Sequence, residues 1–198
     1  MRTLLTRLFG PGAFLALVVS FAVGASSAAH AAVVSYTVSL SGPNESPVNA
    51  SPGVGTGLVE VDAVAHTMHV HVAFSGLTGT TTASHIHAAT VVAGAGTAGV
   101  ATTTPTFAGF PLGVTSGTYD ITLNTTLASS YNPAYVTAHG ATTTQAEADL
   151  FQAIADGKAY LNIHSSQFGG GEIRGFLVPT PGTPATPGTW GRIKSSYR

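Results

Sequence analysis

The chain has 198 residues, of which 7 are Lys or Arg, 8 are Asp or Glu and none is Cys. Charged residues make up only 8% of it, so nothing predicts a nucleic-acid or anionic-membrane partner, because both need clustered basic side chains. Disulfides are excluded, so stability must come from core packing, the hydrogen bonds of a sheet or a bound metal. A composition rich in Gly, Ala, Thr and Val favours strands joined by tight turns over a helical bundle.

Residues 1–31 have the layout of a secretory signal peptide. Arg2 and Arg7 supply positive charge, an uncharged apolar run covers 13–24, and small residues lead to an Ala-His-Ala motif that ends at Ala31. The apolar run is roughly 12 residues long, well short of the ~20 that a membrane-spanning helix needs. We therefore expect cleavage after Ala31, and a mature protein that is secreted, either to the extracellular space or to the periplasm and cell envelope.

Cleavage leaves 167 residues with five basic and eight acidic groups. We expect one domain over 32–178, which is long enough to enclose a hydrophobic core. Residues 179–198 are rich in Pro, Gly and Thr and predict a linker or tail. The end of this tail contains no apolar stretch, so the sequence predicts no integral membrane segment in the mature chain.

Short segments with alternating apolar residues recur along the expected domain. The clearest alternation places Met68, Val70, Val72 and Phe74 on one face of a strand and two histidines on the other. A long loop with short strand pieces is expected over 89–113. The strands expected from this pattern cover residues 36–40, 55–64, 67–74, 84–88, 117–123, 160–164 and 172–178.

A single helix is expected after a proline-containing loop. Thr144 and Glu147 have the spacing of a capping box, apolar residues follow at helical intervals, and Gly157 can end the helix. About seven or more short strands with one short helix predict an all-β fold, an antiparallel β-sandwich.

Four segments, in order, resemble the CHRD domain, the module first described in chordin. They are Val38-Ser-Leu-Ser-Gly-Pro-Asn-Glu-Ser-Pro47, Phe74-Ser-Gly-Leu-Thr-Gly79, Ala83-Ser-His-Ile-His87, and Tyr160-Leu-Asn-Ile-His164 with Gly170-Gly-Glu-Ile-Arg-Gly175. The resemblance covers residues 33–178. It implies an exported β-sandwich that acts as a binding or surface-associated structural module, with an extracellular protein or surface ligand as its unidentified partner. It implies no defined activity, so a non-enzymatic role is favoured.

Three histidines form a candidate metal site for copper or zinc. His85 and His87 are two residues apart on an expected strand, so both side chains point to one face. His164 lies on another expected strand, whose apolar neighbours Leu161 and Ile163 should face the core. Imidazole suits copper and zinc, and three histidines leave a coordination position open. The alternative is structural: the same rings hydrogen-bond to loop backbone and fix the turns.

A fainter resemblance is to copper/zinc superoxide dismutase, which implies a copper-dependent redox enzyme as the alternative function. His85, His87, His164 and Arg174 occur in a comparable order after a Gly-Leu turn. The sequence departs from that family because no histidine lies between His87 and His139, and because the disulfide cysteines are missing. At most the three-histidine site is shared.

The remaining histidines are expected to have other roles. His69 and His71 should lie on the solvated face of their strand, and His66 in an exposed turn. His139, in a loop, is a weaker candidate for a fourth ligand.

Glu172 and Arg174 are alternate residues of the last strand. They predict either an ion pair or hydrogen bonds to a loop. The functional alternative is that Arg174 draws an anion toward the metal.

Overall fold

The computed structural model describes residues 33–181. The expected signal peptide and most of the expected tail lie outside this part of the chain. The strands are β1 (Val34–Ser41), β2 (Val54–Asp62), β3 (Thr67–Ser75), β4 (Thr81–His87), β5 (Gly117–Asn124), β6 (Tyr160–Ser165), β7 (Ile173–Phe176) and β8 (Val178–Pro179). The helices are α1 (Pro133–Ala138) and α2 (Thr143–Ala155), with two 3-10 turns, η1 (Gly42–Asn44) and η2 (Ala128–Ser130).

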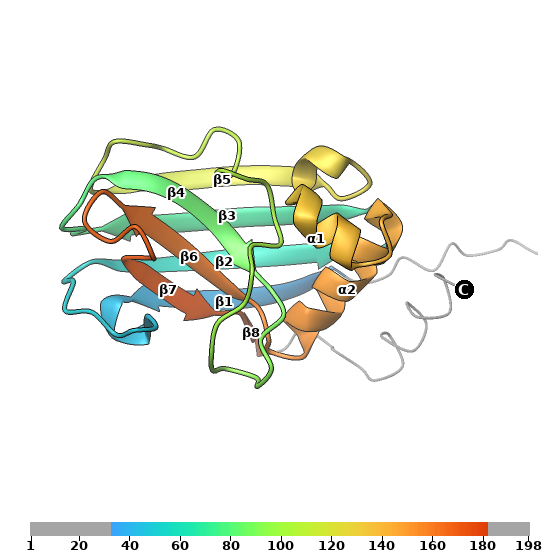
Figure 1. Ribbon diagram of the computed structural model, residues 1–198, viewed down its shortest axis with the longest axis horizontal. Helices are drawn as coiled ribbons and strands as arrows, with labels where there is room; N and C mark the ends of the chain where they lie inside the picture. The colour runs from blue at the N-terminus through green and yellow to red at the C-terminus, as the bar shows by residue number, and fades with distance from the viewer. Residues whose placement is uncertain (1–32, 182–198) are drawn as a thin grey trace, which may run out of the picture.

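The eight strands form one antiparallel sheet in the order β4-β6-β7-β1-β2-β3-β5, with β8 paired to β1. The sheet curls on itself, so that β4, β6 and β7 lie across from β5, β3, β2 and β1, and the two helices lie at one end (Figure 1). The all-β, antiparallel sandwich class predicted from the sequence is confirmed.

The core lies between the two halves of the curled sheet. The predicted apolar face of β3, from Met68 to Phe74, is buried, and its neighbours in β1 and β2 contribute Tyr36 and Val59. From the other half, Leu161 and Ile163 of β6 are completely buried, as the alternation predicted. One face of β6 therefore belongs to the core, and the next residues along the strand, on its other face, include His164.

The helices differ from the prediction in two respects. Helix α2 starts two residues earlier than the capping box implies, because Thr142 rather than Thr144 caps it by accepting a hydrogen bond from the Gln145 N–H. Glu147 is instead buried and accepts a hydrogen bond from the Thr125 hydroxyl at 2.5 Å. Helix α1 lies in a segment expected to be a loop; Asn132 caps it and Pro133 occupies its first position.

Glu172, just before β7, joins three loops in the interior. Its carboxylate accepts hydrogen bonds from the Ser51 hydroxyl at 2.6 Å, the Thr78 N–H at 2.5 Å and the Gly79 N–H at 3.2 Å. Burial raises the pKa of Glu172, but a hydrogen bond from Ser165, together with those from Ser51, Thr78 and Gly79, outweighs burial and holds the pKa below its usual value. Of the two structural alternatives for this residue, hydrogen bonding to loops is the one found.

We expect Glu172→Ala to lower the free energy of unfolding by about 3 kcal/mol, since each buried donor left without an acceptor costs ~1–3 kcal/mol. Urea unfolding of the wild type and the variant measures the difference. Glu60→Ala is the matched control, because Glu60 is partly exposed on the outer face of β2 and its loss should cost at most ~1 kcal/mol. Equal losses in the two variants would contradict this role of Glu172.

Candidate metal centre

The neighbouring strands β4 and β6 bring the three predicted ligands together. In their antiparallel register His85 is opposite Asn162, and His164 is opposite Ala83. Because Ile86 and Ile163 point into the core, the histidines beside them in sequence lie on the outer face of the sheet. Loops cover this face, so the three histidines are only 6%, 8% and 9% exposed.

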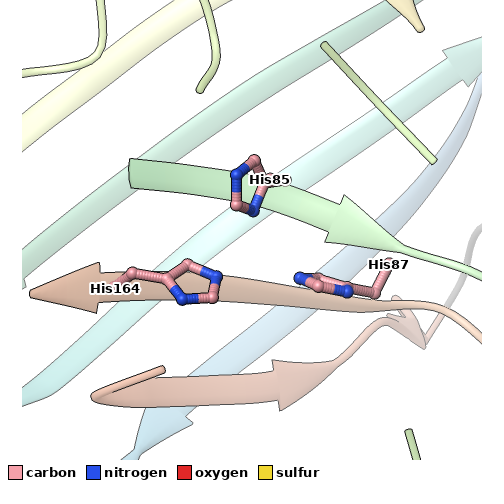
Figure 2. Close-up of side chains that lie close together, drawn as sticks. All are labelled: His85, His87 and His164. Carbon is pink, nitrogen blue, oxygen red and sulfur yellow. The ribbon is translucent and has the colours of Figure 1, made fainter. Parts of the chain in front are cut away.

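The three rings gather over β4 and β6, with those of His87 and His164 pointing toward one another (Figure 2). Ring centroids are separated by 4.9 Å for His85 and His164, 5.5 Å for His85 and His87, and 6.0 Å for His87 and His164. One nitrogen from each ring lies within 4.8 Å of the other two. Nitrogens bound to one ion at ~2.0–2.1 Å are roughly 3.3–4 Å apart, so small ring movements suffice.

Backbone carbonyls fix the tautomer of each ring. His85 bonds through Nε2 to the Pro105 carbonyl at 2.8 Å, and His87 through Nδ1 to the Ala98 carbonyl at 2.9 Å. His164 bonds through Nδ1 to the Gly169 carbonyl at 3.0 Å. A carbonyl oxygen only accepts, so the bonded nitrogen carries the hydrogen and the other nitrogen of a neutral ring holds a lone pair.

The nitrogens that hold these lone pairs are the ones that face one another. His85 Nδ1, His87 Nε2 and His164 Nε2 are all buried and have no hydrogen-bond partner among the described residues. A buried polar atom without a partner costs ~1–3 kcal/mol, and three at one point are unusual in a folded protein. One metal ion between them would satisfy all three, so the donor set fits copper or zinc.

The surroundings keep the rings neutral. Burial, helped by the neighbouring His164 and His87 and opposed by the Pro105 hydrogen bond, lowers the pKa of His85 to about 4. Burial also lowers the pKa of His87 and of His164. Neutral imidazole is the form that binds a metal, so the three rings are in the protonation state that a metal would require.

A stack of aromatic and cationic groups supports His87. The Tyr160 ring lies parallel to the His87 ring, with centroids 4.7 Å apart, and the Arg174 guanidinium lies 4.7 Å from the Tyr160 centroid. The Tyr160 hydroxyl is 3.3 Å from the Ala98 carbonyl, the same group that holds His87. Tyr160 therefore fixes both the ring plane of His87 and the loop above it.

Arg174 and Glu172 do not pair with each other. Arg174 donates from Nε to the Asn44 carbonyl at 2.6 Å, and the same nitrogen is 3.8 Å from Glu45 Oε2. Burial raises the pKa of Glu45 to about 7, against the effect of Arg174.

The other histidines lie away from the centre. His69 contacts Glu60 at 3.2 Å and Asp120 at 2.9 Å on the outer face of β3, where the sequence placed it, and His71 contacts Asp120 at 2.8 Å. His66, in the β2–β3 turn, bonds to Glu147 at 2.9 Å. His139 bonds to Asp149 at 2.7 Å and stacks on Tyr135, and it is not part of the three-histidine group.

Sequence reasoning missed the groups that hold the ligands. The carbonyls of Ala98 and Pro105 belong to the long loop after β4, and that of Gly169 to the loop after β6. Every residue carries a backbone carbonyl, so no residue type marks these positions. Of the groups that support the histidines, Tyr160 was the one that the sequence could indicate, because the alternation places it on the same face of its strand as His164.

Among the described residues, no helix combines the length and the apolar character that crossing a membrane requires. Comparison with curated proteins and with solved structures found no match. The family model of the CHRD domain matches residues 36–177. This match spans β1 to β7 and includes all three histidines of the centre. The chain therefore belongs to the CHRD domain family.

Proposed function

We propose that this protein is an exported CHRD module that binds one copper or zinc ion through His85, His87 and His164. The observation that carries the proposal is the convergence of three buried, unpartnered nitrogens whose rings are locked by carbonyls. Hydrogen bonding to loops, the structural alternative, accounts for one nitrogen of each ring and leaves the second nitrogen unexplained. Copper(II) should bind more tightly than zinc, following the general order of divalent affinities.

Calorimetric titration of the metal-free chain with copper(II) and with zinc tests the proposal. We expect one ion per chain, and competition between the two metals for the same site. A variant with all three histidines replaced by alanine is the control and should bind neither metal tightly. Equal binding by that variant, or no binding by the wild type, would refute the metal function.

Metal binding should persist to lower pH than at an ordinary histidine site. Unperturbed imidazole takes up a proton near pH 6.5, so metal affinity at an ordinary histidine site weakens through that value. Burial lowers the pKa of all three rings, that of His85 to about 4. Protons therefore compete only below pH 6.5, and zinc affinity should stay level from pH 8 to about 6.5 and fall toward pH 4. Titrations in buffers across this range measure it; a tenfold loss between pH 7.5 and 6.5 would contradict it.

A copper-dependent redox enzyme is the second candidate function. It is favoured by the three-ligand set, which leaves a coordination position free for a reactant. Copper-loaded protein should then cycle reversibly between copper(II) and copper(I) at an electrode, and should remove superoxide faster than the His85→Ala variant. Retention of copper without reversible cycling would leave the binding module as the function.

Export is the part of the proposal that depends on residues outside the described structure. It is supported by the basic, apolar and small-residue order of residues 1–31 and by membership of the CHRD family. Mass spectrometry of secreted material should give a chain that begins at Ala32. Soluble extracellular protein that still begins at Met1 would refute the processing site. We propose an extracellular protein or a surface ligand as the partner of the module.

A further inference from the structure

We propose that the three-histidine centre binds a divalent ion together with one small monovalent anion, such as azide, halide or hydroxide, at the ion's fourth position. This inference rests on the proposed metal function and adds a second ligand to the same site. It is carried by the charge and the burial of the groups around the centre.

The protein donors bring no negative charge to the ion. Each ring gives its N–H to a backbone carbonyl and its lone pair to the centre, so each binds as a neutral imidazole. In the part of the chain that the structure describes, the group that can hold a metal consists of the three histidines, without a carboxylate or thiolate. A divalent ion in this donor set keeps its full charge of +2.

The charged side chain that acts on the rings, Arg174, adds positive charge and does not compensate that of the ion. Arg174 lies against the far side of the stack from His87 and acts on His87 as a positive charge. Glu45 lies beside Arg174, with its Oε2 3.8 Å from the Arg174 Nε. A charged Glu45 offsets Arg174, and a neutral Glu45 leaves Arg174 uncompensated. In neither state does the pair supply negative charge to the ion.

Burial makes the uncompensated charge costly. The three rings are at least nine-tenths buried, and a charge removed from water without a counter-ion is strongly unfavourable. Three nitrogens also leave a tetrahedral ion one ligand short. A small anion in the fourth position completes the coordination and halves the buried charge. Copper(I), with a single charge, needs this compensation less.

The test is a titration of the metal-free full chain at pH 6.5 with zinc and copper(II) perchlorates, with and without sodium azide. The azide concentration is set at ten times the dissociation constant of azide from the metal-loaded protein. Because azide stabilises only the metal-loaded form, the apparent affinity for the metal should then rise about tenfold. Copper-loaded protein should gain an azide-to-copper absorption band. The affinity for copper(I) should change less than twofold.

The matched control is a variant in which a side chain of the protein itself supplies the negative charge. Asn162→Asp places a carboxylate opposite His85 and Arg174 in the sheet register. This variant should bind zinc more tightly without azide and lose most of the azide effect. Asn124→Asp makes the same change at the exposed end of β5 and should behave as the wild type.

The outcomes separate the two proposals. No tight metal binding under any condition refutes the metal function and this inference with it. One ion bound with the same affinity with and without azide, and an unchanged copper spectrum, leaves the metal function standing and overturns the anion. A tenfold azide effect in the wild type supports the anion even where Asn162→Asp fails to fold.

Discussion

Replacing His85, His87 or His164 with alanine, one at a time, is expected to remove most of the copper and zinc affinity. Each change deletes one of three donors, so the loss should exceed the roughly 10–100-fold that follows removal of an outer-shell partner. Because the carbonyls of Pro105, Ala98 and Gly169 each hold a different ring, the remaining two rings should keep their orientation. Calorimetric titration, with circular dichroism to confirm folding, measures the effect.

The chain provides a matched control on another strand. His69→Ala and His71→Ala change the second His-x-His pair, which contacts Glu60 and Asp120 on the outer face of β3. Both variants should bind metal as the wild type does. If these two variants lost as much metal affinity as the alanine variants of the three ligands, the assignment of the site to β4 and β6 would be wrong.

Phe74→Ala is expected to have the largest effect on stability, a loss of ~3–5 kcal/mol in the free energy of unfolding. Phe74 is 4% exposed and stacks on Phe110 with ring centroids 5.6 Å apart. Its register partners on both neighbouring strands are glycines, Gly55 and Gly117. Since neither has a side chain that could fill the space, the cavity left by the ring should remain open.

Urea or thermal unfolding measures this loss, and Ser75→Ala is the control. Ser75 is the next residue of β3 and is exposed, so its replacement should change stability by less than ~0.5 kcal/mol. A Phe74→Ala protein as stable as Ser75→Ala would mean that the ring is not packed in the core.

The strands could be predicted because burial leaves a period of two in the sequence. In β3 the alternation from Met68 to Phe74 matches the buried residues one by one. Where the signal depends on a single local motif, details were wrong, although the expected helix is present as α2. Thr144 and Glu147 have capping-box spacing, but tertiary contacts place Glu147 against Thr125 and His66. Helix α1 was missed although Asn132 and Pro133 are typical of a helix start.

Part of the candidate site could also be predicted from the sequence. A His-x-His pair on a strand fixes two side chains on one face, and the core-facing Leu161 and Ile163 fix the direction of His164. The pairing of β4 with β6 was not predictable, because it depends on the topology of the whole sheet. The tautomers were not predictable either, since they are set by backbone carbonyls of loops, and no residue type marks these carbonyls.

Binding of one ion by these three histidines can be seen in a crystal structure of the copper- or zinc-loaded protein, with anomalous diffraction recorded at the absorption edge of the metal. We expect one anomalous peak per chain between β4 and β6. This peak should lie ~2.0–2.1 Å from His85 Nδ1, His87 Nε2 and His164 Nε2, with their second nitrogens still bonded to carbonyls. A peak elsewhere, at His69 and His71 for example, with these three nitrogens unbound, would contradict it.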